Sequence, residues 1–335
     1  NNLMLISYVI MLALYAYAFG SYGSALFVGS DVVWIHKALA AGVIVLFTLV
    51  NLMGSFMTGK TGDVMVFIKL AILLLFVAVG FFTIDTSRLE PSTWTSPTSI
   101  VTGGLMIFLA YEGFELIANT ARDIRAPQKN LPRAYYSAVI FVIFLYIAVA
   151  AVAVGNVSLA EAQKAKDYVL AVAAEPFFGK TGFTIIAIAA MLSTASAINA
   201  TLYGGGRVSY LIAKLGELPE TFDHKVRQGY EGMIIIALLS IIFAITFDLE
   251  SISIAGSAGF LIIFSLVNLA NFRLYKETGG NRFISGFGFL LSVTAIIVLL
   301  TYNGIHNPNS LISSGVVILV VGIFTYVYYK IEKRA

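Results

Sequence analysis

Two long stretches without a charged residue constrain this chain more than any other feature. Residues 134–160 and residues 182–206 contain no Asp, Glu, Lys or Arg. A helix that crosses the hydrocarbon core of a bilayer needs about 20 mostly apolar residues. Only 12% of the chain is charged and 59% is apolar, whereas a soluble domain is about 25% charged. These features predict an all-α polytopic membrane protein with lipid as its solvent.

The same length criterion predicts about ten transmembrane helices within one transmembrane domain, 1–335. The fourth of these helices is expected to be broken near its middle. Residues 156–180 are expected to form an external loop with a short amphipathic helix at 159–174. The predicted helices are 3–28, 33–54, 62–84, 98–121, 133–155, 182–213, 230–248, 251–272, 283–303 and 311–330.

The distribution of Lys and Arg predicts the orientation, because basic residues are retained on the cytoplasmic side of a membrane. If the first predicted helix starts inside, the inner segments hold 15 basic residues and the outer segments hold 5. We therefore expect a multi-pass protein of the cell membrane with both ends of this chain in the cytoplasm.

Several classes of chemistry are disfavoured by residue content. The chain has no Cys, and its three His residues are scattered: His224 and His306 lie outside the predicted spans, and His36 lies near the start of 33–54. An integral membrane enzyme would need a nucleophile–base pair or metal ligands within the helices. We expect no enzyme activity, no metal, no cofactor and no nucleic-acid partner; the oligomeric state cannot be predicted.

Three charged residues lie well inside predicted apolar spans, and Lys69 is the first of them. An amine that is held away from water loses hydration, which brings its pKa towards neutrality. Such a group could exchange a proton during a transport cycle. The alternative is that the side chain snorkels to the inner membrane interface and has no role in coupling.

The fourth predicted helix carries Glu112 and Glu115 near its middle, on one helical face. Gly103, Gly104 and Gly113 lower the helix propensity around them. Polar residues and glycines at the bilayer midplane are typical of the discontinuous helices that bind substrates in transporters. The alternative is that the glycines allow close helix packing and that each Glu pairs with an internal cation.

The sixth predicted helix contains a run of small and hydroxylated residues, among them Ser193 and Ser196. Such residues can coordinate a cation or accept a hydrogen bond from a lysine. Many Ser and Thr residues in membrane helices instead bond a carbonyl of their own helix. Both interpretations remain open for these two residues.

Four segments resemble the amino acid–polyamine–organocation (APC) superfamily, and within it the ApcT-like amino acid permeases. Residues 67–80 are similar to the fifth family helix with its internal lysine. Residues 108–115, followed by 123–133, resemble the broken sixth helix and the next cytoplasmic loop. Residues 207–219 resemble the end of the eighth helix, where the family often shows R-x-x-Y-x-x-A-[RK]-x-G-x-[LI]-P.

The resemblance implies a LeuT-like fold, in which ten of twelve helices form a 5+5 inverted repeat. The ten predicted helices would be the third to the twelfth, so we expect the chain to be N-terminally incomplete by two helices. The substrate would lie against the backbone of Ala110, Tyr111, Glu112, Gly113 and Phe114.

In ApcT-like members the lysine of the fifth helix stands where sodium-coupled relatives hold a sodium ion. The resemblance therefore implies that Lys69 couples transport to protons, with Ser193 or Ser196 as its partner. The predicted function is secondary active transport of amino acids by alternating access, with an amino acid, a proton and the lipid bilayer as partners. Alternatives are an amino acid/polyamine exchanger, a sodium symporter, which a fixed cation at residue 69 disfavours, and a non-transporting fragment of such a permease.

Overall fold

The computed structural model describes residues 2–29, 32–54, 59–111, 113–114, 117, 124–216, 218, 220–227, 229–309, 311–312, 315–316 and 319. The long helices are α1 (Asn2–Val28), α2 (Val33–Leu52), α3 (Gly59–Gly80), α4 (Pro97–Met106), α5 (Pro127–Asn156), α8 (Glu175–Lys214), α9 (Glu231–Thr246), α10 (Leu249–Arg273) and α12 (Arg282–His306).

Short elements join these helices. They are η1 (Phe81–Thr83), η2 (Thr86–Leu89), η3 (Pro91–Thr93), η4 (Phe108–Tyr111), α6 (Leu159–Ala165), η6 (Lys166–Tyr168), α7 (Val169–Ala173), η7 (Glu220–Asp223), β1 (Lys225–Val226), β2 (Gly229–Tyr230) and α11 (Tyr275–Thr278). β1 and β2 form a small antiparallel hairpin.

Seven helices among the described residues are long and apolar enough to cross a membrane: α1, α2, α3, α5, α8, α10 and α12. The shorter helix α9 is also apolar. The predicted class, an all-α polytopic membrane protein, is therefore confirmed. Most of the tenth predicted helix, 311–330, lies outside the described residues.

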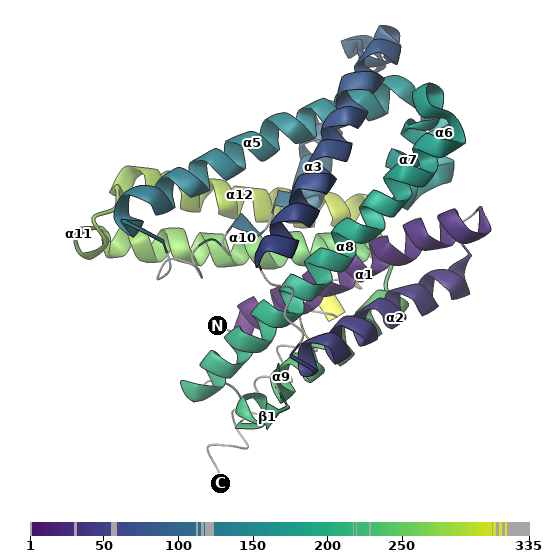
Figure 1. Ribbon diagram of the computed structural model, residues 1–335. Helices are drawn as coiled ribbons and strands as arrows, with labels where there is room; N and C mark the ends of the chain where they lie inside the picture. The colour runs from purple at the N-terminus through teal and green to yellow at the C-terminus, as the bar shows by residue number, and fades with distance from the viewer. Residues whose placement is uncertain are drawn as a thin grey trace.

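Helix α1 lies at the centre of the main apolar core. It packs against α2, α8, α9 and α10 (Figure 1). Side chains on all sides of its first half are buried, including Val9, Ile10 and Leu12. A helix that is apolar all round suits such a central position.

The outer helices leave much of their apolar surface exposed. Phe144, in the middle of α5, is 70% exposed, and Phe283, at the start of α12, is 88% exposed. In water these side chains would form a large apolar patch that a soluble monomer rarely tolerates. Lipid chains remove that penalty, so α5 and α12 have the surface of helices at a lipid boundary.

Two observed helices, α5 and α8, begin well before the predicted ranges, by six and seven residues. α5 begins at Pro127 and contains Pro132, although a proline normally ends or starts a helix. Pro132 lies near the start of α5, where few helical bonds precede it, so its missing N–H interrupts little of the helix. α8 begins at Glu175 and bends at Gly179, which has a φ of 61°.

The segment expected as an external loop is largely helical. Within 156–180 the structure has α6, η6, α7 and the first turn of α8, so the single amphipathic helix expected at 159–174 is divided. The division falls at Lys166, whose φ is 45°. The Ser158–Glu161 capping box starts α6.

Candidate functional site

Helix α4 ends inside the range predicted for the fourth membrane helix. Its last residue is Met106, and η4 then continues the chain as a 3-10 helix to Tyr111. Gly113 follows with a φ of +111°, a conformation that residues with a Cβ rarely adopt. The backbone at 107–111, and again at Gly113, therefore leaves the regular α-helical path.

A serine on α10 satisfies two backbone groups that the end of α4 leaves without helical partners. The Ser257 hydroxyl accepts a hydrogen bond from the Leu109 N–H at 3.1 Å and donates one to the Met106 carbonyl at 2.9 Å. Ser257 is fully buried. Since no water would replace these bonds in an apolar interior, the hydroxyl allows the chain to leave the helix there.

The neighbouring glycine allows this close approach between α10 and η4. A Cβ at Gly256 would lie 2.4 Å from a methyl carbon of Leu109. Leu109 is buried against the main core. A larger residue at position 256 would push η4 away from the Ser257 hydroxyl.

A tyrosine on α5 holds the other side of the break. The Tyr146 hydroxyl donates a hydrogen bond to the Ala110 carbonyl at 3.1 Å. Its ring also lies 5.1 Å from the ring of Tyr111, centroid to centroid. Tyr146 therefore fixes the position of η4 through one hydrogen bond and one aromatic contact.

The break opens onto a cavity of about 1310 Å³ between α1, η4, α5, α10 and α12. Aromatic side chains form much of its wall. Phe114 stacks on Phe264 at 5.6 Å, and Phe108 lies edge-on to Phe264 at 6.0 Å. The described lining also includes Asn268 and Ser292 as polar groups. A largely apolar cavity with a few polar groups is the usual form of a small-molecule site.

The structure places four of the five predicted substrate-binding residues at this cavity. Ala110, Tyr111, Gly113 and Phe114 all line it. Glu112 lies outside the described residues, as does Glu115. The position of these two carboxylates relative to the cavity therefore stays a prediction.

Lys69 lies in α3, which packs against α5 and α8. It is about 15 Å along the axis from Gly59, but only three residues into the apolar span Val66–Thr83. Its side chain is half-buried. Among the described residues Lys69 has no hydrogen-bond or ion-pair partner, and it is not part of the described cavity lining.

Ser193 and Ser196 both lie in α8, which packs against α3. Ser193 is exposed and Ser196 is half-buried. No hydrogen bond joins either hydroxyl to Lys69 in the described part of the chain. Their predicted role as partners of the lysine remains a prediction.

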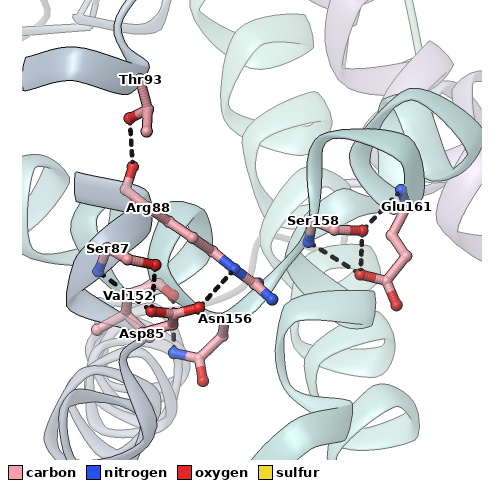
Figure 2. Close-up of polar contacts among 8 residues, drawn as sticks. All are labelled: Asp85, Ser87, Arg88, Thr93, Val152, Asn156, Ser158 and Glu161. Atoms are coloured by element: carbon pink, nitrogen blue, oxygen red, sulfur yellow. Dashed lines mark hydrogen bonds and ion pairs between the residues drawn. The ribbon is translucent and has the colours of Figure 1, made fainter. Parts of the chain in front are cut away.

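A second polar group lies on the segments between the membrane helices. A hydrogen bond from the Ser87 hydroxyl lowers the pKa of Asp85, and a hydrogen bond from the Ser87 backbone N–H lowers it further. The Ser158 hydroxyl and backbone N–H lower the pKa of Glu161, and the Arg88 charge adds to this effect. Arg88 lies 3.3 Å from Asp85 and extends towards the start of α6 (Figure 2). The Asp85 backbone N–H donates to the Gly155 carbonyl at 3.0 Å, and this bond joins the connection after α3 to the end of α5.

The sequence interpretation missed Ser257 and Tyr146. Ser257 belongs to a run of small residues in α10, which could have indicated a close backbone approach. Tyr146 belongs to the uncharged run 134–160, and a phenol in an apolar segment needs a hydrogen-bond partner. Neither signal identifies η4 as the segment that these residues contact. Within the described residues no cluster of His, Cys, Asp or Glu could hold a metal ion.

Fold and site together define a multi-pass helical membrane protein with a cavity at a helix break. Residues 2–324 match the family described as amino acid permease. The chain therefore belongs to the amino acid permease family of the APC superfamily, as the sequence motifs predicted.

Relatives agree with this family. The chain is 37% identical to an uncharacterized protein of Methanocaldococcus jannaschii, over 99% of this chain and 77% of the relative. It is 32% identical to the inner membrane transport protein YbaT of Escherichia coli, over 88% of this chain and 69% of the relative. It is 28% identical to the methylthioribose transporter of Bacillus subtilis, over 80% and 58%. The named relatives are transporters, so the chain belongs with transporters and not with enzymes.

Proposed function

We propose that the protein is a secondary active transporter that moves amino acids across the cell membrane by alternating access. The observation that carries this proposal is the break after Met106, which opens onto the 1310 Å³ cavity. Backbone groups near a helix break can bind the carboxylate and ammonium groups of an amino acid. We propose that the substrate lies against 110–114, with Glu112 included.

We further propose that Lys69 couples this transport to protons. A half-buried amine without a partner among the described residues is suited to gain and lose a proton. Movement of α3 against α8 would change the hydration of that amine and so link its protonation to the conformational cycle. Ser193 and Ser196 on α8 are the proposed hydrogen-bond partners in one of these conformations.

The test is uptake of radiolabelled amino acids by the full-length protein in liposomes under an imposed pH gradient. We expect uptake that depends on the gradient in the wild-type protein and is lost in Lys69→Ala. The matched control is Lys164→Ala, which removes an exposed lysine in α6. Gradient-driven uptake that survives in Lys69→Ala would contradict the coupling role.

Counterflow measurements distinguish proton-coupled transport from exchange and from sodium symport. Liposomes preloaded with unlabelled amino acid should exchange it for external label in both the wild type and Lys69→Ala, because exchange needs no net proton movement. Uptake that requires preloading in the wild type would instead favour the amino acid/polyamine exchanger. Uptake driven by a sodium gradient would identify a sodium symporter. No uptake in any condition would contradict the transport proposal itself.

The proposed orientation has both ends of this chain in the cytoplasm. The chain contains no Cys, so single cysteines can report the side of each loop. We expect Lys276→Cys, in α11, to be protected in intact cells from a membrane-impermeant thiol reagent. We expect Lys164→Cys, in α6, to react, and the opposite pattern would reverse the topology.

A further inference from the structure

A second cavity, separate from the helix break, lies at the end of the bundle that the loop charges assign to the cytoplasm. Its volume is about 530 Å³, and it lies between the C-terminal end of α2, the last turns of α8, β2 and the start of α9. β2 contacts all three helices. The lining includes Arg207 and three tyrosines, Tyr203, Tyr210 and Tyr230.

Arg207 is the one charged residue among the described residues that line this cavity. It is exposed, and within the described part of the chain it has no hydrogen-bond or ion-pair partner. A guanidinium group presents five donors in a planar fork that matches phosphate or carboxylate oxygens. Arg207 is therefore available for an anion that enters the cavity.

The other charges around the cavity favour an anion as well. Lys214 lies 5.8 Å from the ring of Tyr210, and Lys225 pairs with Tyr230 across the hairpin. One carboxylate lies nearby as well: Glu231 is 3.4 Å from the His224 imidazole, which is charged only when protonated.

Three tyrosines give the cavity further donors and a rigid wall. Tyr203, Tyr210 and Tyr230 line it, and the last two stack with ring centroids 4.4 Å apart. A phenol can donate to an anionic oxygen. The stacked pair joins α8 to β2, so the wall does not depend on the ligand to hold its shape.

We propose that this cavity binds a phosphate ester, with Arg207 as the main contact and the tyrosine hydroxyls as additional donors. A volume of about 530 Å³ falls within the range of pockets for organic ligands, so it can hold a headgroup larger than inorganic phosphate. Basic pockets between membrane helices on the cytoplasmic side commonly bind anionic lipid headgroups. The ligand is thus either the headgroup of an anionic phospholipid or a soluble phosphate ester, and both have the same contacts.

The test uses purified full-length protein, stripped of lipid in detergent, and native mass spectrometry to count bound molecules. Dimyristoyl phosphatidylglycerol is compared with dimyristoylglycerol, which has the same chains and no phosphate. We expect the anionic lipid to bind the wild type about tenfold more tightly, as one charge-assisted contact implies. Arg207→Gln should remove that preference.

The matched control is Arg273→Gln, which removes an equally exposed arginine from the end of α10 on the same predicted side of the membrane. It should leave the preference unchanged. Tyr210→Phe keeps the stacked ring and should weaken binding by a smaller factor. Equal effects of Arg207→Gln and Arg273→Gln would overturn the proposal, as would equal binding of the two lipids together with no binding of glycerol 3-phosphate.

Glycerol 3-phosphate distinguishes the two sources of the ligand. If it binds the wild type but not Arg207→Gln, and the two lipids bind equally, the site serves a soluble phosphate ester. If the lipid binds through Arg207 and glycerol 3-phosphate does not compete, the site serves a phospholipid. Neither measurement requires transport activity, so this proposal can fail while the proposed function stands, and the reverse also holds.

Discussion

Replacing Ser257 by Ala should destabilise the protein more than any other exchange of one hydroxyl for hydrogen in α10. The hydroxyl of Ser257 serves both the Leu109 N–H and the Met106 carbonyl. Ala would leave both groups without that partner in a fully buried place. A buried polar group that loses its partner costs about 1–3 kcal/mol.

Two such groups would together cost about 2–6 kcal/mol if their penalties added. Hydrogen bonds in membrane proteins have measured couplings that average about 0.6 kcal/mol, because the unfolded chain in the bilayer also finds partners. The average of about 0.6 kcal/mol applies to side-chain pairs that can find other partners. The two backbone groups at the break have few alternative partners nearby. We therefore expect a loss of at least about 2 kcal/mol in the free energy of unfolding.

Ser265→Ala is the matched control on the same helix. Ser265 is also buried, but its hydroxyl donates to the Leu261 carbonyl of its own helix at 2.8 Å. That carbonyl keeps its helical N–H partner when the hydroxyl is removed, so the change should stay within about 0.5 kcal/mol.

The assay is equilibrium unfolding in bicelles, followed for both variants and the wild type under the same lipid conditions. Amino acid uptake in liposomes provides a second readout, since a displaced η4 should raise the KM. Equal losses of stability for Ser257→Ala and Ser265→Ala would refute the argument that Ser257 supports the break.

Three further predictions concern the same site and the connecting segments. Gly113→Ala should cost about 1–3 kcal/mol because of its φ of +111°, while Gly103→Ala, in α4 and equally free of close neighbours, should be neutral or stabilising in the same unfolding assay. Tyr146→Phe removes the bond to Ala110 and should raise the KM for uptake about fivefold, as the loss of about 1 kcal/mol implies; an unchanged KM would contradict this. The lowered pKa of Glu161 means that its ionised form stabilises α6 above the unfolded-state pKa, and that this contribution is lost as the pH falls through the folded-state pKa. Amide exchange in α6 should therefore accelerate on acidification in the wild type and depend less on pH in Glu161→Gln.

The class of fold could be predicted from the sequence because the main signal, a long apolar run without charges, depends only on residues within one helix. A run such as 134–160 can satisfy its backbone in lipid as a helix, whatever else the chain does. The approximate place of the break was also predictable, since Gly113 and its polar neighbours weaken a helix where they stand. Boundaries were less predictable, because α5 tolerates Pro132 and α8 extends back to Glu175.

The partners of the break could not be predicted from the sequence. Ser257 is 148 residues away from Leu109, and a serine among small residues usually indicates only close packing. Tyr146 is likewise one aromatic residue among many in apolar helices. Such partners depend on which helices become neighbours, and the order of residues along one helix does not contain that information.

The polar groups inside this protein fall into two kinds with different consequences. Ser257 and Tyr146 each have defined partners, so their removal should lower stability and distort the site whether or not protons take part in transport. Lys69 has no partner among the described residues, so the fold gains little from its charge and its loss should be tolerated. An amine that the fold does not need, kept in an apolar span where a charge is costly, calls for a functional explanation. Comparing Ser257→Ala with Lys69→Ala in the same liposomes tests this distinction: the serine variant should lose stability and substrate affinity, and the lysine variant should lose only the response to the pH gradient.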